Sequence, residues 1–549
     1  MAENKRNTVK FTKTSFILFL LLIVVFSSWL RIRHILNNPV MVHDEAISYL
    51  AATANQGEYH DAIENKTFPY GEWATVKDWQ EFLKSDGKLA FSKIQNDLAA
   101  YDVHPPLYFW LLHLWVLIFG VNFWTGPLLN VFLSALNIVL LAFLARNIMN
   151  CDFRALAVAI TYAFSPGVMS TTFLARNYEL FSFFSILFLW GLRRLFVKDA
   201  DALFLTGSIL TVIVFLGLLT HYYFGLFAAA AFLAYFVWGI RQQENFNLFF
   251  KKLLTLGTSS AVGLLLMLMA HSEFFHQFFS FQSQGQPFSG FDLVLRILKV
   301  CLGISGYFVE VHRRGAPETS WLLLIILGVI VSTALIKPLR RRLFPQNQPV
   351  LMNSQITFLL IYLTLVIGIM VTLYLTFFTH QAVMGPRYLS PVFPVLSFFP
   401  VLFFRLWGRK ETIGIIAFVC LMLISGTLYA RPWFQLNAEK QAEISRADTI
   451  LVDNVSRGIL PIFMMYLPAD KLVFAAMQDD LLDNKKWISG LKHRVLFLSA
   501  LEYGNTASKR IALIEGIQDE YEAILVPGGQ WGLYGLGQAY AFRRKGDNP

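Results

Sequence analysis

Two short clusters of acidic and imidazole side chains interrupt a mostly apolar chain. One is His43-Asp44-Glu45, which follows the first apolar run, and the other contains Asp102 and His104 just before a pair of prolines. A carboxylate held beside a hydroxyl group can remove its proton during attack, as a general base does. Two neighbouring carboxyls close to lipid also raise the pKa of one of them. The alternatives are a solvated loop or a helix N-cap for the first cluster, and anchoring of a surface helix for the second.

Three further polar residues lie where other apolar segments end. Arg176 follows the third predicted span, Glu179 lies at the start of the fourth, and His221 follows the fifth. A carboxylate at the membrane boundary is costly unless it is paired or used. These residues are candidates for substrate binding, although an ion pair between Arg176 and Glu179 would also account for the first two.

Two cationic clusters could bind an anion. Arg313 and Arg314 lie between apolar segments, and Arg387-Tyr388 opens a late one. Arginine and tyrosine can hold a phosphate through charge-assisted, sometimes bidentate, hydrogen bonds. An arginine that extends from a helix end toward water is the alternative for Arg387.

The composition indicates that lipid is the solvent for much of this chain. Of its 549 residues 56% are hydrophobic and only 15% are charged, whereas soluble proteins carry about 25% charged residues. The net charge of +10 is distributed in short clusters between apolar runs, which is typical of topology signals rather than of nucleic-acid binding. Three widely spaced cysteines indicate neither a disulfide framework nor a thiolate metal site. Carboxylate and histidine groups could hold a divalent metal, but no spacing indicates one, and the sequence identifies no other cofactor.

Apolar segments of about the length needed to cross a bilayer predict eleven spans. They lie near residues 14–33, 125–145, 155–173, 178–196, 202–220, 223–240, 253–271, 320–337, 355–378, 389–405 and 411–430. A twelfth apolar stretch, 105–120, begins with two prolines and is shorter. If it does not cross, five basic clusters between spans lie on the same side as the basic N-terminus, as the positive-inside rule expects, and the pair Arg313-Arg314 lies on the outer side. We therefore predict that 105–120 is an interfacial or re-entrant helix.

This topology predicts a multi-pass protein of the cytoplasmic (inner) membrane with three outer regions. A first loop (34–124) and a middle loop (272–319) belong to a membrane domain, 1–430, and residues 431–549 form a separate outer domain. The tail alternates short β-like runs at 449–452, 472–475, 495–498 and 523–526 with polar helical stretches, which predicts a small α/β domain. The glycine-rich segment 528–537 lacks the G-x-G-x-x-G pattern, so a loop beside strands is favoured over a nucleotide site.

Taken together, these segments resemble the GT-C glycosyltransferases of the protein O-mannosyltransferase and aminoarabinose-transferase type. The matches are Asp44-Glu45 after the first span, D-V-H-P-P-L at 102–107 before an interfacial helix, and Arg387-Tyr388 at the start of a late span. The resemblance implies an all-α polytopic GT-C fold with about 11 transmembrane helices and interfacial helices.

The resemblance extends over roughly residues 10–430 and implies a reaction. A sugar would pass, with inversion, from a polyprenyl-phosphate donor to a glycan, lipid or protein acceptor on the outer face of the membrane. Asp44 would act as the general base, and Glu45 would position it or bind sugar hydroxyls. Some family members carry an Asp near the start of the fourth span, where this chain has Glu179. No W-W-D motif occurs, which counts against an oligosaccharyltransferase.

Two other classes of protein remain in competition. A transporter or flippase for a lipid-linked sugar would need ionisable residues in mid-span and repeated halves, but the charges here gather at loop edges. A non-catalytic scaffold or sensor would use its tail to bind a partner. Incubation with a polyprenyl-phosphate sugar distinguishes them by glycosidic product, vectorial movement or neither.

Overall fold

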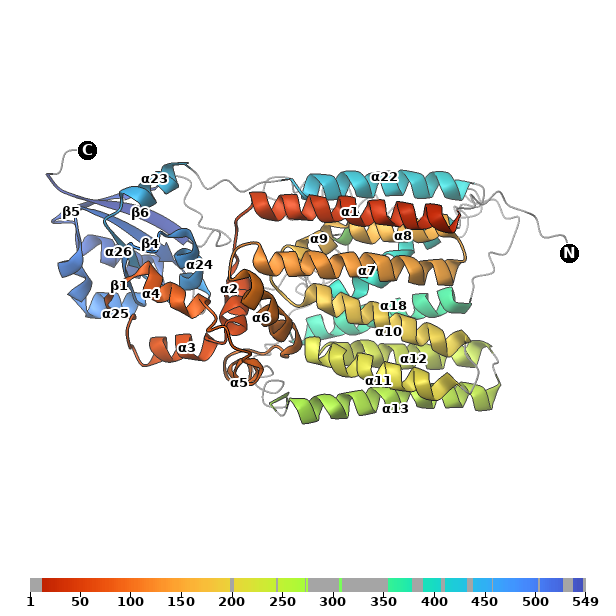
Figure 1. Cartoon of the computed structure of the whole chain (residues 1–549). Coiled ribbons are helices and arrows are strands. Elements are labelled where there is room, and N and C mark those ends of the chain that lie inside the picture. The colour runs from red at the N-terminus through yellow and green to blue at the C-terminus, as the bar shows by residue number, and fades with distance from the viewer. Residues whose placement is uncertain are drawn as a thin grey trace.

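The computed structural model consists of a bundle of long helices with an α/β domain at one end, and the first-loop helices lie between them (Figure 1). It describes residues 12–197, 202–242, 245–271, 273–274, 306–308, 354–377, 389–405, 410–431, 438–456, 458–501, 504–526 and 537–546. The predicted fold class, a polytopic helical protein with a small C-terminal α/β domain, is confirmed.

The bundle helices lie side by side along one direction (Figure 1). In chain order they are α1 (Lys13–Asn37), α7 (Thr125–Met149), α8 (Asp152–Ala163), α9 (Pro166–Thr172), α10 (Tyr178–Val197), α11 (Leu203–Thr220), α12 (Phe224–Gln242), α13 (Phe246–Ala270), α18 (Ser354–Phe377), η3 (Ser390–Val392), α20 (Phe393–Leu396), α21 (Phe398–Arg405) and α22 (Glu411–Tyr429). Among the described residues, five helices (α1, α7, α11, α13 and α22) are long and apolar enough to cross a membrane, and the bent pair α8–α9 is a sixth. The predicted span 320–337 lies outside the described residues.

A bend of 53° separates α8 from α9. Ser165 is the N-cap of α9, where its Oγ accepts the Val168 N–H over 3.2 Å, and Pro166 occupies the first turn. Proline has no N–H to continue the preceding helix, which explains the break. The segment that follows α9, residues 173–177, reaches the first-loop helices.

The first loop is largely helical. Its elements are α2 (His43–Ala52), α3 (Gln56–Glu64), β1 (Trp73–Thr75), α4 (Val76–Gln80), η1 (Glu81–Leu83), α5 (Phe91–Tyr101) and α6 (Leu107–Phe119). Helix α6 is the predicted interfacial helix and has 13 residues, about 20 Å, too short for the roughly 30 Å hydrocarbon core. It lies at the junction between the bundle and the rest of the first loop (Figure 1).

The α/β domain is built on a six-stranded sheet in the order β1-β3-β2-β4-β6-β5. Its C-terminal elements are α23 (Ala438–Arg446), β2 (Thr449–Val452), α24 (Ile459–Tyr466), β3 (Leu472–Ala475), α25 (Gln478–Asp483), η5 (Lys485–Gly490), β4 (Arg494–Ala500), α26 (Ala507–Glu515), β5 (Tyr521–Leu525) and β6 (Gly537–Arg544). Strand β2 is parallel to both neighbours, and the outer strands are antiparallel.

The four predicted β-like runs coincide with or overlap β2, β3, β4 and β5, and two strands were not predicted. One is β6, which follows the glycine-rich segment. The other is β1, which comes from the first loop and pairs with β3. The sheet therefore includes a strand from residues 1–430, which were predicted to form the membrane domain. The sheet thus crosses the predicted domain boundary at residue 430.

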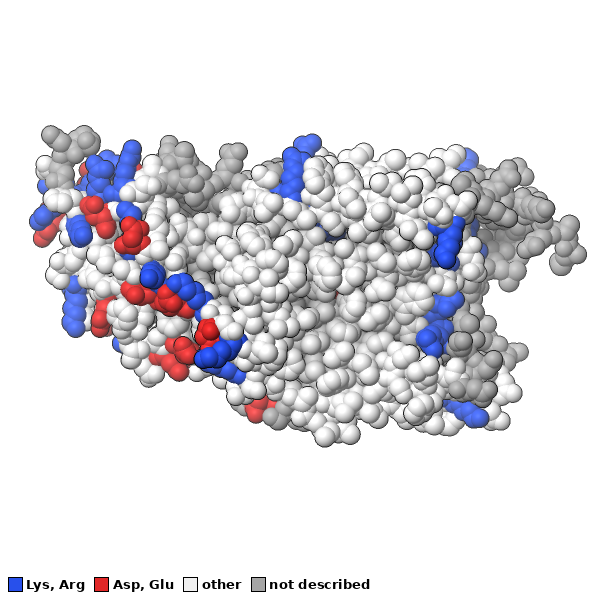
Figure 2. Space-filling view, viewed as in Figure 1, with Lys and Arg blue, Asp and Glu red and all other residues white. Residues whose placement is uncertain are grey.

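Charged side chains are distributed unequally along the molecule. On the face shown in Figure 2, Lys and Arg occur without Asp or Glu at the bundle end away from the sheet, and both signs occur over the α/β domain and first loop. The surface between them is almost free of charge. This is the pattern that the basic clusters predicted for a chain that crosses a membrane.

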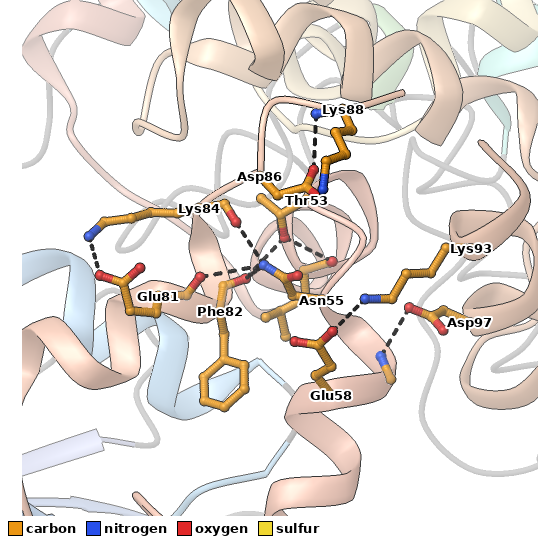
Figure 3. Close-up of polar contacts among 12 residues, drawn as sticks. Thr53, Asn55, Glu58, Glu81, Phe82, Lys84, Asp86, Lys88, Lys93 and Asp97 are labelled. Atoms are coloured by element: carbon orange, nitrogen blue, oxygen red, sulfur yellow. Dashed lines mark hydrogen bonds and ion pairs between the residues drawn. The ribbon is translucent and has the colours of Figure 1, made fainter. Parts of the chain in front are cut away.

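A polar network fixes the first loop at the C-terminal end of α2 (Figure 3). The Asn55 side-chain amide donates to the carbonyl oxygens of Glu81, Phe82 and Lys84, at 3.4, 3.2 and 2.7 Å. The Thr53 hydroxyl donates to the same Phe82 carbonyl over 3.0 Å. These bonds tie α2 to the η1 turn, and through it to β1 and the sheet.

We expect Asn55→Ala to destabilise the protein by about 1–2 kcal/mol, because it removes these bonds from three carbonyl groups. Trypsin cleavage after Lys84 and Lys88 should become faster, since both follow the released turn. Thermal unfolding in detergent and timed proteolysis measure the two effects. The exposed Asn65 on the same loop provides a matched control as Asn65→Ala, and equal behaviour of the two variants would contradict the prediction.

Candidate active site

The two carboxyls of the first cluster lie in the first turn of α2, where the helix dipole favours negative charge. Glu45 is 2% exposed, and its two oxygens accept the N–H groups of Val42 and Ala175, both over 2.9 Å. The Asp44 side chain is 30% exposed, and its Oδ1 lies 3.7 Å from His43 Nδ1. The pair therefore has one inward and one outward carboxyl.

Their different environments give Glu45 a higher pKa than an ordinary carboxyl. Burial raises the pKa of Glu45 to about 8, although the amides of Val42 and Ala175 donate to it, and the charge of Asp44 adds to the rise. Near neutral pH the negative charge of the pair therefore resides mainly on Asp44. Such a split is the usual basis for assigning distinct roles to paired carboxyls.

The second cluster meets the first through an arginine. Arg176 has only donor atoms, so its Nη2 donates to His104 Nε2 over 3.1 Å. His104 therefore carries its proton on Nδ1, which donates to Asp102 Oδ1. Burial alone would raise the pKa of Asp102, but its interactions with His104 and Arg176 lower it to about 2. Asp102, His104 and Arg176 thus form one chain of polar contacts.

Arg176 continues this chain to the helix that carries the acidic pair. Its Nη1 donates to the Asp44 carbonyl over 3.3 Å and to Ser48 Oγ over 3.2 Å. The Arg176 residue is 6% exposed, and its Nε has no hydrogen-bond partner in the described structure. A buried guanidinium with a spare donor beside Asp44 provides positive charge at the site.

Two asparagines hold the segment that carries Arg176. Asn130 on α7 donates to the carbonyl oxygens of Leu174 and Arg176, and Asn177 donates to the Thr220 carbonyl over 2.7 Å. Asn130, Ser134 and Asn137 are all buried, and their spacing of four and three residues places them on one face of α7. These three polar residues lie on one face of the predicted span 125–145, and that spacing is a sequence signal for a polar contact inside the bundle.

His221 lies beside the same chain of contacts. Its ring is 6.3 Å from the His104 ring and stacks on Phe181 at 4.9 Å. Burial, together with His104 and Arg176, lowers the pKa of His221 to about 3, so the ring is neutral. The structure therefore brings His221 to the edge of the site as an uncharged group.

Glu179 belongs to a separate buried network. It is 1% exposed, and its carboxylate accepts hydrogen bonds from four side chains at 2.9–3.3 Å: those of Thr171, Thr172, Asn137 and Tyr162. The ion pair with Arg176 that the sequence left open is absent from the described contacts, because Arg176 points to α2 and His104 instead. In this structure Glu179 holds α9 against α7 and α8.

The other predicted site residues lie outside the described part of the chain. They are Arg313, Arg314, Arg387 and Tyr388. Among the described residues, no group of three or more His, Cys, Asp or Glu side chains is placed to hold a metal ion.

Comparison with known proteins gives this geometry a chemical context. Residues 103–269 match the family model described as dolichyl-phosphate-mannose-protein mannosyltransferase. This segment is less than a third of the chain and includes His104, Arg176 and His221. No curated protein matches the chain.

Solved structures show the same fold over nearly the whole length. The structure of ArnT from Cupriavidus metallidurans bound to undecaprenyl phosphate is 12% identical, with a TM-score of 0.51, and the match covers 96% of this chain and 98% of that one. The chain has the GT-C-type fold of this ArnT. The apo structure of the same ArnT is also similar, with a TM-score of 0.40 and 11% identity over 96% of this chain and 98% of that one.

The GT-C resemblance drawn from the short motifs is therefore confirmed. Within this fold the structure brings together Asp44, Glu45, Asp102, His104 and Arg176, with His221 at the edge. These residues come from α2, from the turn before α6, and from the segments after α9 and α11. They are far apart in sequence and adjacent in the fold.

Glu45 predicts a pH dependence of stability. Its pKa in the folded protein, about 8, is above the ordinary value of 4.5, so folding favours its protonated form. This contribution to stability is complete below about pH 4.5 and is lost as the pH rises through 8, by at most about 1.4 kcal/mol per pH unit. Thermal unfolding between pH 5 and pH 8 should therefore depend less on pH in Glu45→Gln than in wild type.

The matched control is Glu64→Gln, at an exposed position of α3. It should retain the wild-type slope. A Glu45→Gln slope equal to that of wild type would show that the buried carboxyl does not titrate in this range.

Proposed function

We propose that this glycosyltransferase transfers a sugar from a polyprenyl-phosphate donor to a hydroxyl acceptor on the outer face of the cytoplasmic membrane, with Asp44 as the general base. The observation that carries the proposal is the position of Asp44. Asp44 is the partly exposed carboxyl of a pair in which Glu45 is buried, and the buried Arg176 donates to the backbone carbonyl of Asp44.

The donor class is supported by two printed descriptions. The family model that matches residues 103–269 is named for dolichyl-phosphate-mannose, and the ArnT structure with the higher TM-score contains undecaprenyl phosphate. Both are polyprenyl phosphates, so we assign this class of lipid carrier to the donor. The acceptor hydroxyl belongs to a glycan, a lipid or a protein.

Asp44 supplies what a hydroxyl acceptor requires. The hydroxyl is a weak nucleophile until a carboxylate accepts its proton during attack on the anomeric carbon. One displacement on the side opposite the phosphate forms the new glycosidic bond with inversion. Glu45, protonated and held by two backbone amides, positions Asp44 and leaves it as the charged member of the pair.

The leaving group is a lipid phosphate whose negative charge grows as the sugar departs. In the described structure, Arg176 is the cation at the site. It donates a hydrogen bond to His104, which in turn donates to Asp102. Arg387 and Tyr388, with Arg313 or Arg314, are proposed to hold the phosphate itself. Each preorganised donor of this kind stabilises a developing charge by about 3 kcal/mol. Glu179, whose oxygens already accept four hydrogen bonds, is assigned to holding α9 rather than to a sugar hydroxyl.

Asp44→Asn should lower transfer by about 100- to 10,000-fold, because the amide cannot accept the acceptor's proton. The measurement uses purified protein, a polyprenyl-phosphate sugar and envelope acceptors, with the glycosidic product detected by mass spectrometry. Asp86→Asn, at an exposed carboxylate of the same loop, should retain activity. Full activity of Asp44→Asn would remove Asp44 from the base role, and movement of the donor without product would favour a transporter.

The proposed outer location predicts a labelling pattern. In a chain whose native cysteines are replaced, a cysteine at exposed Ser508 on α26 should react with a membrane-impermeant thiol reagent in intact cells. A cysteine at exposed Lys410, at the start of α22, should react only after permeabilisation. Reaction of both positions in intact cells would contradict the topology.

A further inference from the structure

The C-terminal domain contacts α2 through the segment that follows one of its parallel strands, β2. Strands β3, β2 and β4 are parallel neighbours, and in such sheets the edge formed by these ends usually receives a ligand. Here the segment that follows β2, residues 453–466, contacts the first loop instead. The element that it reaches is α2, which carries Asp44.

Two hydrogen bonds connect this segment to either side of Asp44 in the sequence. Tyr466 OH donates to the Pro39 carbonyl over 2.9 Å, four residues before α2 begins. Tyr59 OH donates to the Val455 carbonyl over 2.7 Å, from α3, and Tyr59 is 1% exposed. The C-terminal domain thus contacts the chain both before and after the acidic pair.

Gly458 makes the closest approach. A Cβ atom built on Gly458 would lie 2.6 Å from the His43 carbonyl oxygen and 2.8 Å from its Cδ2. The φ angle of Gly458 is −113°, which other residues also adopt. Glycine is therefore required here for space, because any side chain would displace the residue next to Asp44.

The segment that presents Gly458 is itself anchored in the sheet. Asp453 is fully buried and accepts hydrogen bonds from Gln478 Nε2, Ser499 Oγ and the Ala500 N–H, at 2.6, 2.6 and 3.0 Å. Asn454 donates to the Ala500 carbonyl over 3.1 Å. Residues 453 and 454 are thus fixed to the sheet, and Gly458 itself is the N-cap of α24, whose residues 459–464 are buried.

We infer that the C-terminal domain positions the catalytic carboxylate, with Gly458 as the positioning residue that sets the first turn of α2 through His43. The consequence for the reaction rests on the proposed function, whereas the mechanical contact does not. The domain would then determine the rate of transfer without touching the sugar.

The test compares Gly458→Ala with Gly516→Ala in the full-length protein. At Gly516 an added Cβ would meet no atom closer than 3.4 Å, so this variant should behave as wild type. Gly458→Ala should lower kcat by about 10- to 100-fold, as a small displacement of a catalytic group does, with the KM for the donor unchanged. Hydrogen exchange should become faster for the amides of α2 and stay unchanged for those of α7 and β4.

Tyr466→Phe removes the hydroxyl that donates to the Pro39 carbonyl and provides a second variant if Gly458→Ala does not fold. It should change α2 exchange and kcat in the same direction, by less. Unchanged α2 exchange in either folded variant, or unchanged kcat with an active wild type, would overturn the inference. If wild type forms no product but α2 exchange still responds to Gly458→Ala, the positioning contact stands and the proposed reaction is wrong.

Discussion

The contact between α2 and the segment that follows α9 is the constraint on which the rest of the site depends. Glu45 accepts the Ala175 N–H from a position 130 residues away in sequence, and Arg176 donates to the Asp44 carbonyl. Separation of the two segments would remove the Ala175 bond from Glu45 and the Asp44 and Ser48 bonds from Arg176, and each buried polar group left without its partner costs about 1–3 kcal/mol. The bend between α8 and α9 directs residues 173–177 toward α2, and the side-chain amide of Asn130 holds this segment through the carbonyl oxygens of Leu174 and Arg176.

The same contact gives the two carboxyls different chemistry. Adjacent residues on a helix point in directions about 100° apart, so when Glu45 faces the segment at 175, Asp44 faces away from it toward water. Burial then raises the pKa of Glu45, whereas the side chain of Asp44 stays 30% exposed. The sequence alone does not show which of the two neighbouring acids is buried. The orientation of α2 against residues 175–176 determines it.

Sequence predicted what depends on local pattern. Basic clusters and two prolines predicted a short interfacial or re-entrant helix at 105–120, where α6 has 13 residues, and β2 and β3 have the predicted bounds. The short motifs also gave Asp44, His104 and Arg176 as candidate site residues, and the structure places them in contact. What local pattern could not predict was pairing at a distance. The first-loop strand β1 is three residues long and has no signal of its own, since its partner β3 is about 400 residues later.

Glu179 and Gly458 show the same limit from two sides. A carboxylate near a membrane boundary looks functional from its cost alone, but four donors from three other segments make Glu179 a structural group. A glycine in a loop looks unremarkable until the neighbouring backbone is known. In both cases the role is set by atoms that belong to other parts of the chain.

Helix α2 has ten residues, a length at which an isolated helix is marginal in water. Its position must therefore be set by what it touches, and it touches both halves of the molecule: residues 175–176 on the membrane side, and 455–466 on the side of the sheet. The Asp44 carboxylate, which we propose as the general base, thus lies between the two parts of the molecule rather than within either one. Helix α2 keeps its position only while both surfaces that contact it keep their shape.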